Sequence, residues 1–100
     1  MGVRRGEAPK RIRAAVELKT AAERLNFQVE YVNMKTSEFN ALLDSGLTYG
    51  QLLVQLIATW DADYPLSSDG FNDLEDERPG CLVGLLQGWH KARLAEREGN

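Results

Sequence analysis

The spacing of apolar residues predicts two regular helices in the C-terminal half of the chain. From Tyr49 to Trp60 the apolar side chains recur at intervals of three and four residues, while glutamine and threonine occupy the opposite face. Thr48 and Gln51 have the spacing of a capping box at the start of this helix. A second helix is predicted from Gly80 to about Glu96, because its leucines and tryptophan share one face.

The N-terminal half contains a longer predicted helix, the only convincing strand and a short helix. Pro9 suits a first helical turn, and an apolar stripe with oppositely charged residues four apart extends the prediction to about Leu25. Residues 27–32 alternate apolar and polar side chains with strand-prone residues, which indicates a strand. A short helix is expected over residues 36–44, ending before Gly46.

These elements predict a mainly α (small α+β) fold, with about four helices and one short strand near 27–32 in a compact single domain. The domain is expected to cover residues 8–97, after a flexible basic arm (1–7) and before a frayed tail (98–100). A lone strand must pair with another segment of the chain or with its own copy, and we expect the homodimer.

Composition removes several functional classes. The chain has 100 residues and a single cysteine, Cys81, so it cannot form an internal disulfide or a thiolate zinc site. His90 is the only histidine, and no phosphate-binding glycine motif, nucleophile elbow or metalloprotease motif occurs. We therefore expect a non-enzymatic protein without metal or cofactor. No secretory signal or membrane span is recognisable, so a cytoplasmic location is expected.

Charge is segregated along the chain, although the net charge is only −3. Residues 1–35 carry eight Lys or Arg against four Glu, whereas residues 36–77 carry nine acidic residues and no Lys or Arg. Interfaces commonly combine apolar anchors with a charged rim, so the connection between the last two helices is a candidate docking surface for a basic partner. Its residues are Asp61, Asp63, Tyr64, Asp69, Phe71, Asp73, Glu75, Asp76 and Glu77, with Leu74 as a further anchor.

A nucleic-acid-binding alternative rests on residues 27–60. Their predicted order of strand, helix, turn and capped helix resembles the ribbon-helix-helix repressors, which implies dimerisation through the strand and a ribbon in the DNA major groove. In that case Gln28, Glu30 and Val32 would face the bases if Phe27, Val29 and Tyr31 face the core. Phosphate contacts would have to come from the arm and its continuation, at Arg4, Arg5, Lys10, Arg11 and Arg13, because residues 36–77 carry no cation.

The last predicted helix carries a ridge of small residues at Gly80, Gly84, Gly88 and Ala92. Interior glycine costs a helix about 1 kcal/mol relative to alanine, so close packing should compensate. We expect the helix at 48–60 to fill this ridge, with self-association as the alternative. Together these features predict a small protein-binding or regulatory protein. Arginine outnumbers lysine eight to four, a composition that suits a phage or bacterial accessory protein.

Overall fold

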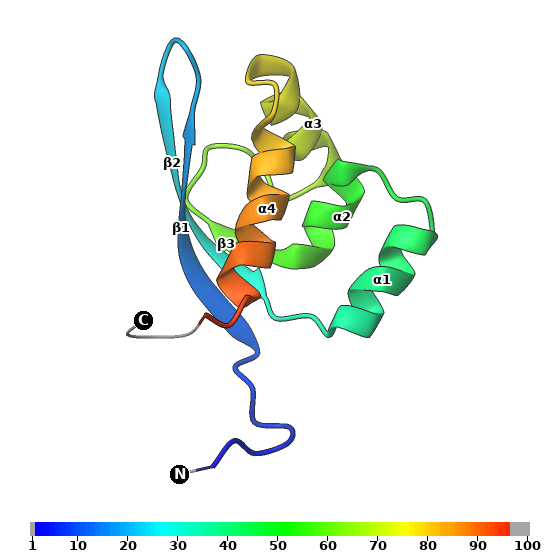
Figure 1. The fold of residues 1–100 in the computed structure, drawn as a ribbon. Coiled ribbons are helices and arrows are strands. Elements are labelled where there is room, and N and C mark those ends of the chain that lie inside the picture. Colours follow the sequence, from blue (N-terminus) through cyan, green and yellow to red (C-terminus); the bar gives the residue numbers. More distant parts are fainter. Residues whose placement is uncertain (1, 97–100) are drawn as a thin grey trace.

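The computed structural model describes residues 2–96 and shows a sheet with the helices on one side of it (Figure 1). The three strands are antiparallel and lie in the order β1–β2–β3, so β2 is the central strand. Along the chain the elements are β1 (Arg11–Lys19), β2 (Arg24–Val32), α1 (Thr36–Asp44), α2 (Tyr49–Leu56), β3 (Ile57–Trp60), α3 (Ser68–Glu77) and α4 (Cys81–Arg93).

The fold is therefore α+β, and the prediction of a mainly helical domain with one strand is wrong. The largest error lies in residues 9–25, which form β1, a tight turn and the start of β2 instead of a helix. In β1 the even-numbered residues 12–18 are buried or half-buried and the odd-numbered residues are exposed. Charge pairs four apart share a face on a strand as well as on a helix, so they could not distinguish the two.

The turn between β1 and β2 is built around Thr20. Its hydroxyl oxygen accepts hydrogen bonds from the backbone N–H groups of Ala22 (3.1 Å) and Glu23 (2.9 Å). A threonine side chain that bonds the backbone two and three residues later favours a turn over a continuing helix. The two strands then pair without interruption from Lys19 opposite Arg24 to Arg11 opposite Val32.

The helix predicted at 48–60 is divided between α2 and β3. The capping box is confirmed, since Thr48 accepts from the N–H of Gln51 at 3.2 Å and Gln51 reaches back to Thr48 at 3.0 Å. The helix ends at Leu56 because Ile57–Trp60 pairs with β2. Trp60 consequently lies on a strand, half-buried, with its ring 5.9 Å from that of Phe27 and 5.0 Å from that of Phe71.

The strand predicted at 27–32 is confirmed as part of β2, but both of its edges are filled within the chain, by β1 and β3. Pairing of this strand with its own copy therefore has no free edge to use, and the reason for expecting a strand-mediated homodimer is lost. The helix at 36–44 is confirmed as α1. The last helix is confirmed over Cys81–Arg93, and the predicted frayed tail at 98–100 lies outside the described residues.

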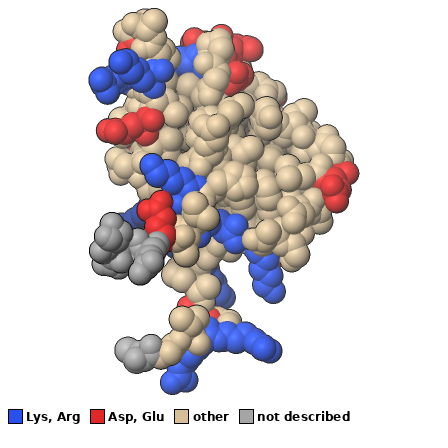
Figure 2. Space-filling model, viewed as in Figure 1, with Lys and Arg blue, Asp and Glu red and all other residues tan. Residues whose placement is uncertain are grey.

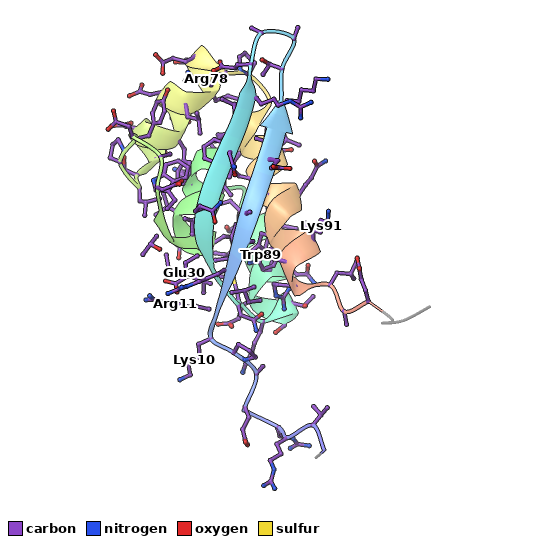
Figure 3. All side chains as sticks on the ribbon, turned by 90° about the vertical axis from the view of Figure 1, so that its left-hand side faces the viewer. Lys10, Arg11, Glu30, Arg78, Trp89 and Lys91 are labelled. Atoms are coloured by element: carbon purple, nitrogen blue, oxygen red, sulfur yellow. The ribbon has the colours of Figure 1, made fainter. Side chains whose placement is uncertain are left out.

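The core lies between the inner face of the sheet and helices α2, α3 and α4. Its fully buried side chains include Tyr31 from β2, Leu53 from α2, Phe71 from α3 and Trp89 from α4. The Tyr31 hydroxyl donates to the Leu85 carbonyl at 2.8 Å, and burial raises the pKa of this phenol. The outer face of the sheet is not covered by any helix of residues 2–96 and is lined by polar and charged side chains (Figure 3).

Candidate binding surfaces

Two of the predicted acidic docking residues serve the fold. Asp61 follows β3 and accepts a hydrogen bond from the Gln28 N–H at 2.9 Å. The carboxylate of Glu75 accepts from the N–H groups of Gly80 (2.8 Å) and Leu82 (3.1 Å), so it caps α4. Gly80 itself has a φ of +96°, a conformation that favours glycine at this position. Both carboxylates therefore accept hydrogen bonds within the fold.

Two of the three predicted apolar anchors are not available at the surface. Phe71 and Leu74 are 0% and 1% exposed, because α3 turns both toward the core. Tyr64 is half-buried, and its hydroxyl contacts both the Glu77 carboxylate and the Arg78 guanidinium. The hydrogen bond to Glu77 is the main cause that raises the pKa of Tyr64. The acidic segment therefore presents charge without a large exposed apolar side chain.

Four of the five remaining carboxylates share one shallow concavity. Those of Asp63, Asp73, Asp76 and Glu77 line it together with Tyr64 and Pro65, and its volume is about 360 Å³; we call it the acidic concavity. Asp69 lies in the first turn of α3 and is exposed outside this set. Within residues 2–96 no cation approaches Asp63, Asp73 or Asp76 to salt-bridge distance. Acidic atoms gather at the top of the molecule, over α3 (Figure 2).

The basic residues of the nucleic-acid alternative are divided between the arm and the sheet. Arg4, Arg5 and Lys10 lie in the exposed segment before β1. Arg11 and Arg13 lie on β1, and both approach the same Glu30 carboxylate of β2, at 3.2 Å and 3.8 Å. Figure 3 shows Arg11 beside Glu30, with Lys10 just beyond the end of the sheet. The glutamate reduces the positive field at this end.

The ribbon-helix-helix arrangement also meets an obstacle in the sheet. A ribbon of that family joins one strand from each of two protomers, whereas β2 has intramolecular neighbours on both sides. Gln28 and Glu30 do lie on the outer face, as expected from the burial of Phe27, Val29 and Tyr31. They belong to a three-stranded sheet, however, and Glu30 is already paired with arginine.

The glycine ridge of α4 was predicted to pack on the helix at 48–60, and this is wrong. The ridge packs on the sheet. A Cβ on Gly84 would lie 2.6 Å from Leu18 Cδ2 of β1, and one on Gly88 would lie 2.6 Å from the Tyr31 hydroxyl of β2. Ala92 is half-buried against the same core. Gly80 contributes to the αL cap and meets nothing within 4 Å, so only Gly84 and Gly88 permit the close approach of helix to sheet.

Cys81 and His90 do not form a reactive pair. Cys81 is buried at the start of α4, and burial raises the pKa of its thiol, which disfavours the thiolate. His90 is exposed and lies edge-on to the rings of Phe39 and Trp89. Across residues 2–96 no group of three His, Cys, Asp or Glu side chains is placed to hold a metal ion. None of the helices in this part of the chain is long and apolar enough to cross a membrane.

The surface that the sequence reasoning missed is the edge of β1. Because residues 9–25 were interpreted as a helix, no sheet edge was expected there. The signal for a strand is the alternation of apolar and charged residues in RIRAAVELK. The adjacent Ala14 and Ala15 interrupt this alternation. Figure 1 shows β1 at the outside of the sheet with α4 beside it.

Comparison with protein-family models, curated proteins and solved structures finds no match to this chain.

Proposed function

We propose that this protein is a non-enzymatic binding protein that docks a partner with a basic surface. The acidic concavity supports this proposal, because Asp63, Asp73 and Asp76 reach it from a loop and from α3 without an ionic partner among residues 2–96. Like charges held together repel one another, and a cationic partner relieves that repulsion. This concentration of carboxylates would speed and orient encounter with such a partner.

The partner's contact is expected to be polar. With Phe71 and Leu74 inside the core, the apolar contribution at the acidic concavity is limited to Tyr64 and Pro65. Lysine or arginine side chains, whose stems are apolar and whose ends are charged, match such a lining. Attraction between exposed charges is screened by salt, so association should be strongly sensitive to ionic strength.

The test compares three forms of the protein in affinity capture from the source cell, followed by association kinetics with the captured protein. The first form is wild type, and the second is Asp63→Asn/Asp73→Asn/Asp76→Asn. The third is a charge-matched control, Glu7→Gln/Asp44→Asn/Glu96→Gln, whose residues are exposed and outside the acidic concavity. Glu75 is left unchanged because it caps α4.

We expect wild type and control to retain the same discrete protein and the triple variant at the acidic concavity to lose it. With the purified partner, association of that variant should be slower by about tenfold at low salt, and the difference should shrink at high salt. Equal capture and equal rates for all three forms would assign the carboxylates to solubility alone. Salt-sensitive binding of duplex DNA that is lost on changing Arg4, Arg5 and Lys10 would favour the nucleic-acid alternative.

A further inference from the structure

β1 is a nine-residue strand at the edge of the sheet. On the side away from β2, its backbone N–H and C=O groups have no partner among residues 2–96. The backbone of Asn33 donates to Lys10 at one end of the β1–β2 pairing, and Thr20 donates to Glu23 at the other. Hydrogen-bonded pairs alternate along an antiparallel ladder, so the even-numbered residues of β1 bond to β2. The N–H and C=O groups of the odd-numbered residues, from Arg11 to Lys19, point away from the sheet.

This edge lacks the features that usually block strand addition. Proteins protect edges by making them short, by proline or by a bulge, or by covering them. β1 contains no proline, and its register with β2 is continuous over all of its residues. The bulge in this sheet lies on the other side, between β2 and β3. The one protective feature that β1 does have is charge.

A groove runs along this edge, between β1 and α4. It consists of two adjoining depressions of about 420 and 460 Å³ that share Leu18, Gly84 and Gln87; we call it the β1–α4 groove. Figure 3 shows α4, marked by Lys91, directly beside β1. Gly84 and Gly88 line the helix side of the groove, and Val83, 40% exposed, adds an apolar wall. An added strand could place alternate side chains in this space.

The charge on the edge selects the kind of strand. The charged side chains of β1 on the outer face are Arg11, Arg13 and Lys19, against a single Glu17. Glu30 of β2 lies beside Arg11 and Arg13, so these three cations and two carboxylates leave a small positive excess. Arg13 has 91% of its side chain exposed, and Lys91 lines the groove on the helix side. Two copies of β1 placed edge to edge would bring two strands of net positive charge together. An acidic strand would instead neutralise the edge, because opposite charges on directly opposed residues stabilise a pair of strands.

We propose that the edge of β1 accepts an extended segment of a partner protein, with small apolar residues toward the β1–α4 groove and acidic residues on the outer face. Backbone hydrogen bonds would supply affinity, and the alternating side chains would supply specificity. This surface is distinct from the acidic concavity and selects the opposite charge. The proposal therefore stands or falls independently of the proposed function.

The direct test uses a capped synthetic peptide, Glu-Val-Thr-Val-Thr-Val-Glu-Val-Glu, designed to pair antiparallel with β1. Its valines would face the β1–α4 groove, and its glutamates and threonines would lie on the outer face. Its glutamates would then oppose Lys19, Arg13 and Arg11. The control peptide has lysine in place of each glutamate. Amide hydrogen exchange and amide chemical shifts of the full chain are followed by NMR during titration to about 1 mM, a concentration that detects weak complexes. We expect the odd-numbered amides of β1 to become protected with the acidic peptide and not with the lysine peptide.

Two variants make the test specific. Ala15→Pro removes an N–H that points to the free edge and leaves the bonds to β2 intact, a position where strands tolerate proline. It should weaken peptide binding by about tenfold, which corresponds to one lost hydrogen bond and poorer strand contact. The charge-reversal variant Arg13→Glu/Lys19→Glu should exchange the preference, binding the lysine peptide and rejecting the acidic one. This variant serves if Ala15→Pro does not fold.

Three results would overturn the proposal. The first is unchanged exchange and shifts of the odd-numbered β1 amides with the acidic peptide at the highest concentration. The second is equal binding of both peptides with no exchange of preference in the charge-reversal variant. The third is protection of these amides in the free protein, whether by a second copy, seen as a dimeric mass in light scattering, or by the chain's own residues 97–100.

Discussion

Gly88→Ala is the substitution that tests most directly how α4 packs on the sheet. An added Cβ would lie 2.6 Å from the Tyr31 hydroxyl and 2.9 Å from Val16 Cγ2, whereas ordinary contacts between such atoms are about 3.5 to 4.0 Å. Tyr31 cannot move freely, because it is fully buried and its hydroxyl is held at 2.8 Å by the Leu85 carbonyl. The methyl group must therefore displace the phenol or the helix.

The magnitude follows from opposing contributions. Alanine improves helix propensity by about 1 kcal/mol relative to glycine. Overpacking a core costs about 1 to 3 kcal/mol, and a buried hydrogen bond broken by displacement of Tyr31 adds about 1 to 3 kcal/mol. We expect a net loss of about 1 to 5 kcal/mol in the free energy of unfolding. Gly84→Ala should be close to neutral, because the atoms it meets are the methyl groups of Leu18, a half-buried side chain on the edge strand.

The assay is urea denaturation followed by tryptophan fluorescence, with the midpoint compared at constant slope. The same measurement on Tyr31→Phe and on the double variant Tyr31→Phe/Gly88→Ala completes a double-mutant cycle. Removing the hydroxyl relieves the shortest contact, so Gly88→Ala should cost about 1 kcal/mol less in the phenylalanine background. A Gly88→Ala midpoint equal to or above that of wild type would refute the placement of α4 on Tyr31.

Two further predictions concern buried and capping groups. Burial raises the pKa of the Tyr31 phenol in the folded state. The stabilisation from the neutral phenol is therefore complete below the ordinary tyrosine pKa of about 10 and is lost as the pH rises above it. In alkaline denaturation, the stability of Tyr31→Phe should fall less steeply with pH than that of wild type, and identical profiles would contradict this. Glu75→Ala removes the cap of α4 and should lower the free energy of unfolding, measured in urea, by about 0.5 to 2 kcal/mol. The control Asp76→Ala, at an exposed position, should change it by no more than about 0.5 kcal/mol. Equal effects of the two substitutions would contradict the capping role of Glu75.

Sequence reasoning succeeded where local chemistry determines the element. The capping box at Thr48 and Gln51 fixes where α2 begins, and the alternation of residues 27–32 identifies the central strand. Helix α4 was predicted because its apolar positions keep helical spacing over its whole length. In each case the side chains that form the pattern are also the ones that the fold buries.

It failed where a distant partner determines the element. Ile57–Trp60 continues the apolar spacing of α2, but β2 offers it an edge and the strand forms instead. The docking residues were predicted from the density of carboxylates and the apolar side chains near them in the sequence, and tertiary structure then used Asp61 and Glu75 as internal acceptors and buried Phe71. Composition along the chain could not show which carboxylates remain for a partner.

The reinterpretation of residues 11–19 also changes what the basic N-terminal half can do. On a helix, Arg13 and Glu17 would be neighbours that neutralise each other. On β1 they share one face but are separated by Ala15, and the cross-strand neighbour of Arg13 is Glu30. The Glu30 carboxylate of β2 lies 3.8 Å from the Arg13 guanidinium and leaves that side chain 91% exposed. Exposed positive charge thus lies beside a row of unpaired backbone groups, and we expect this combination to give the edge strand a preference for an acidic segment over a copy of itself.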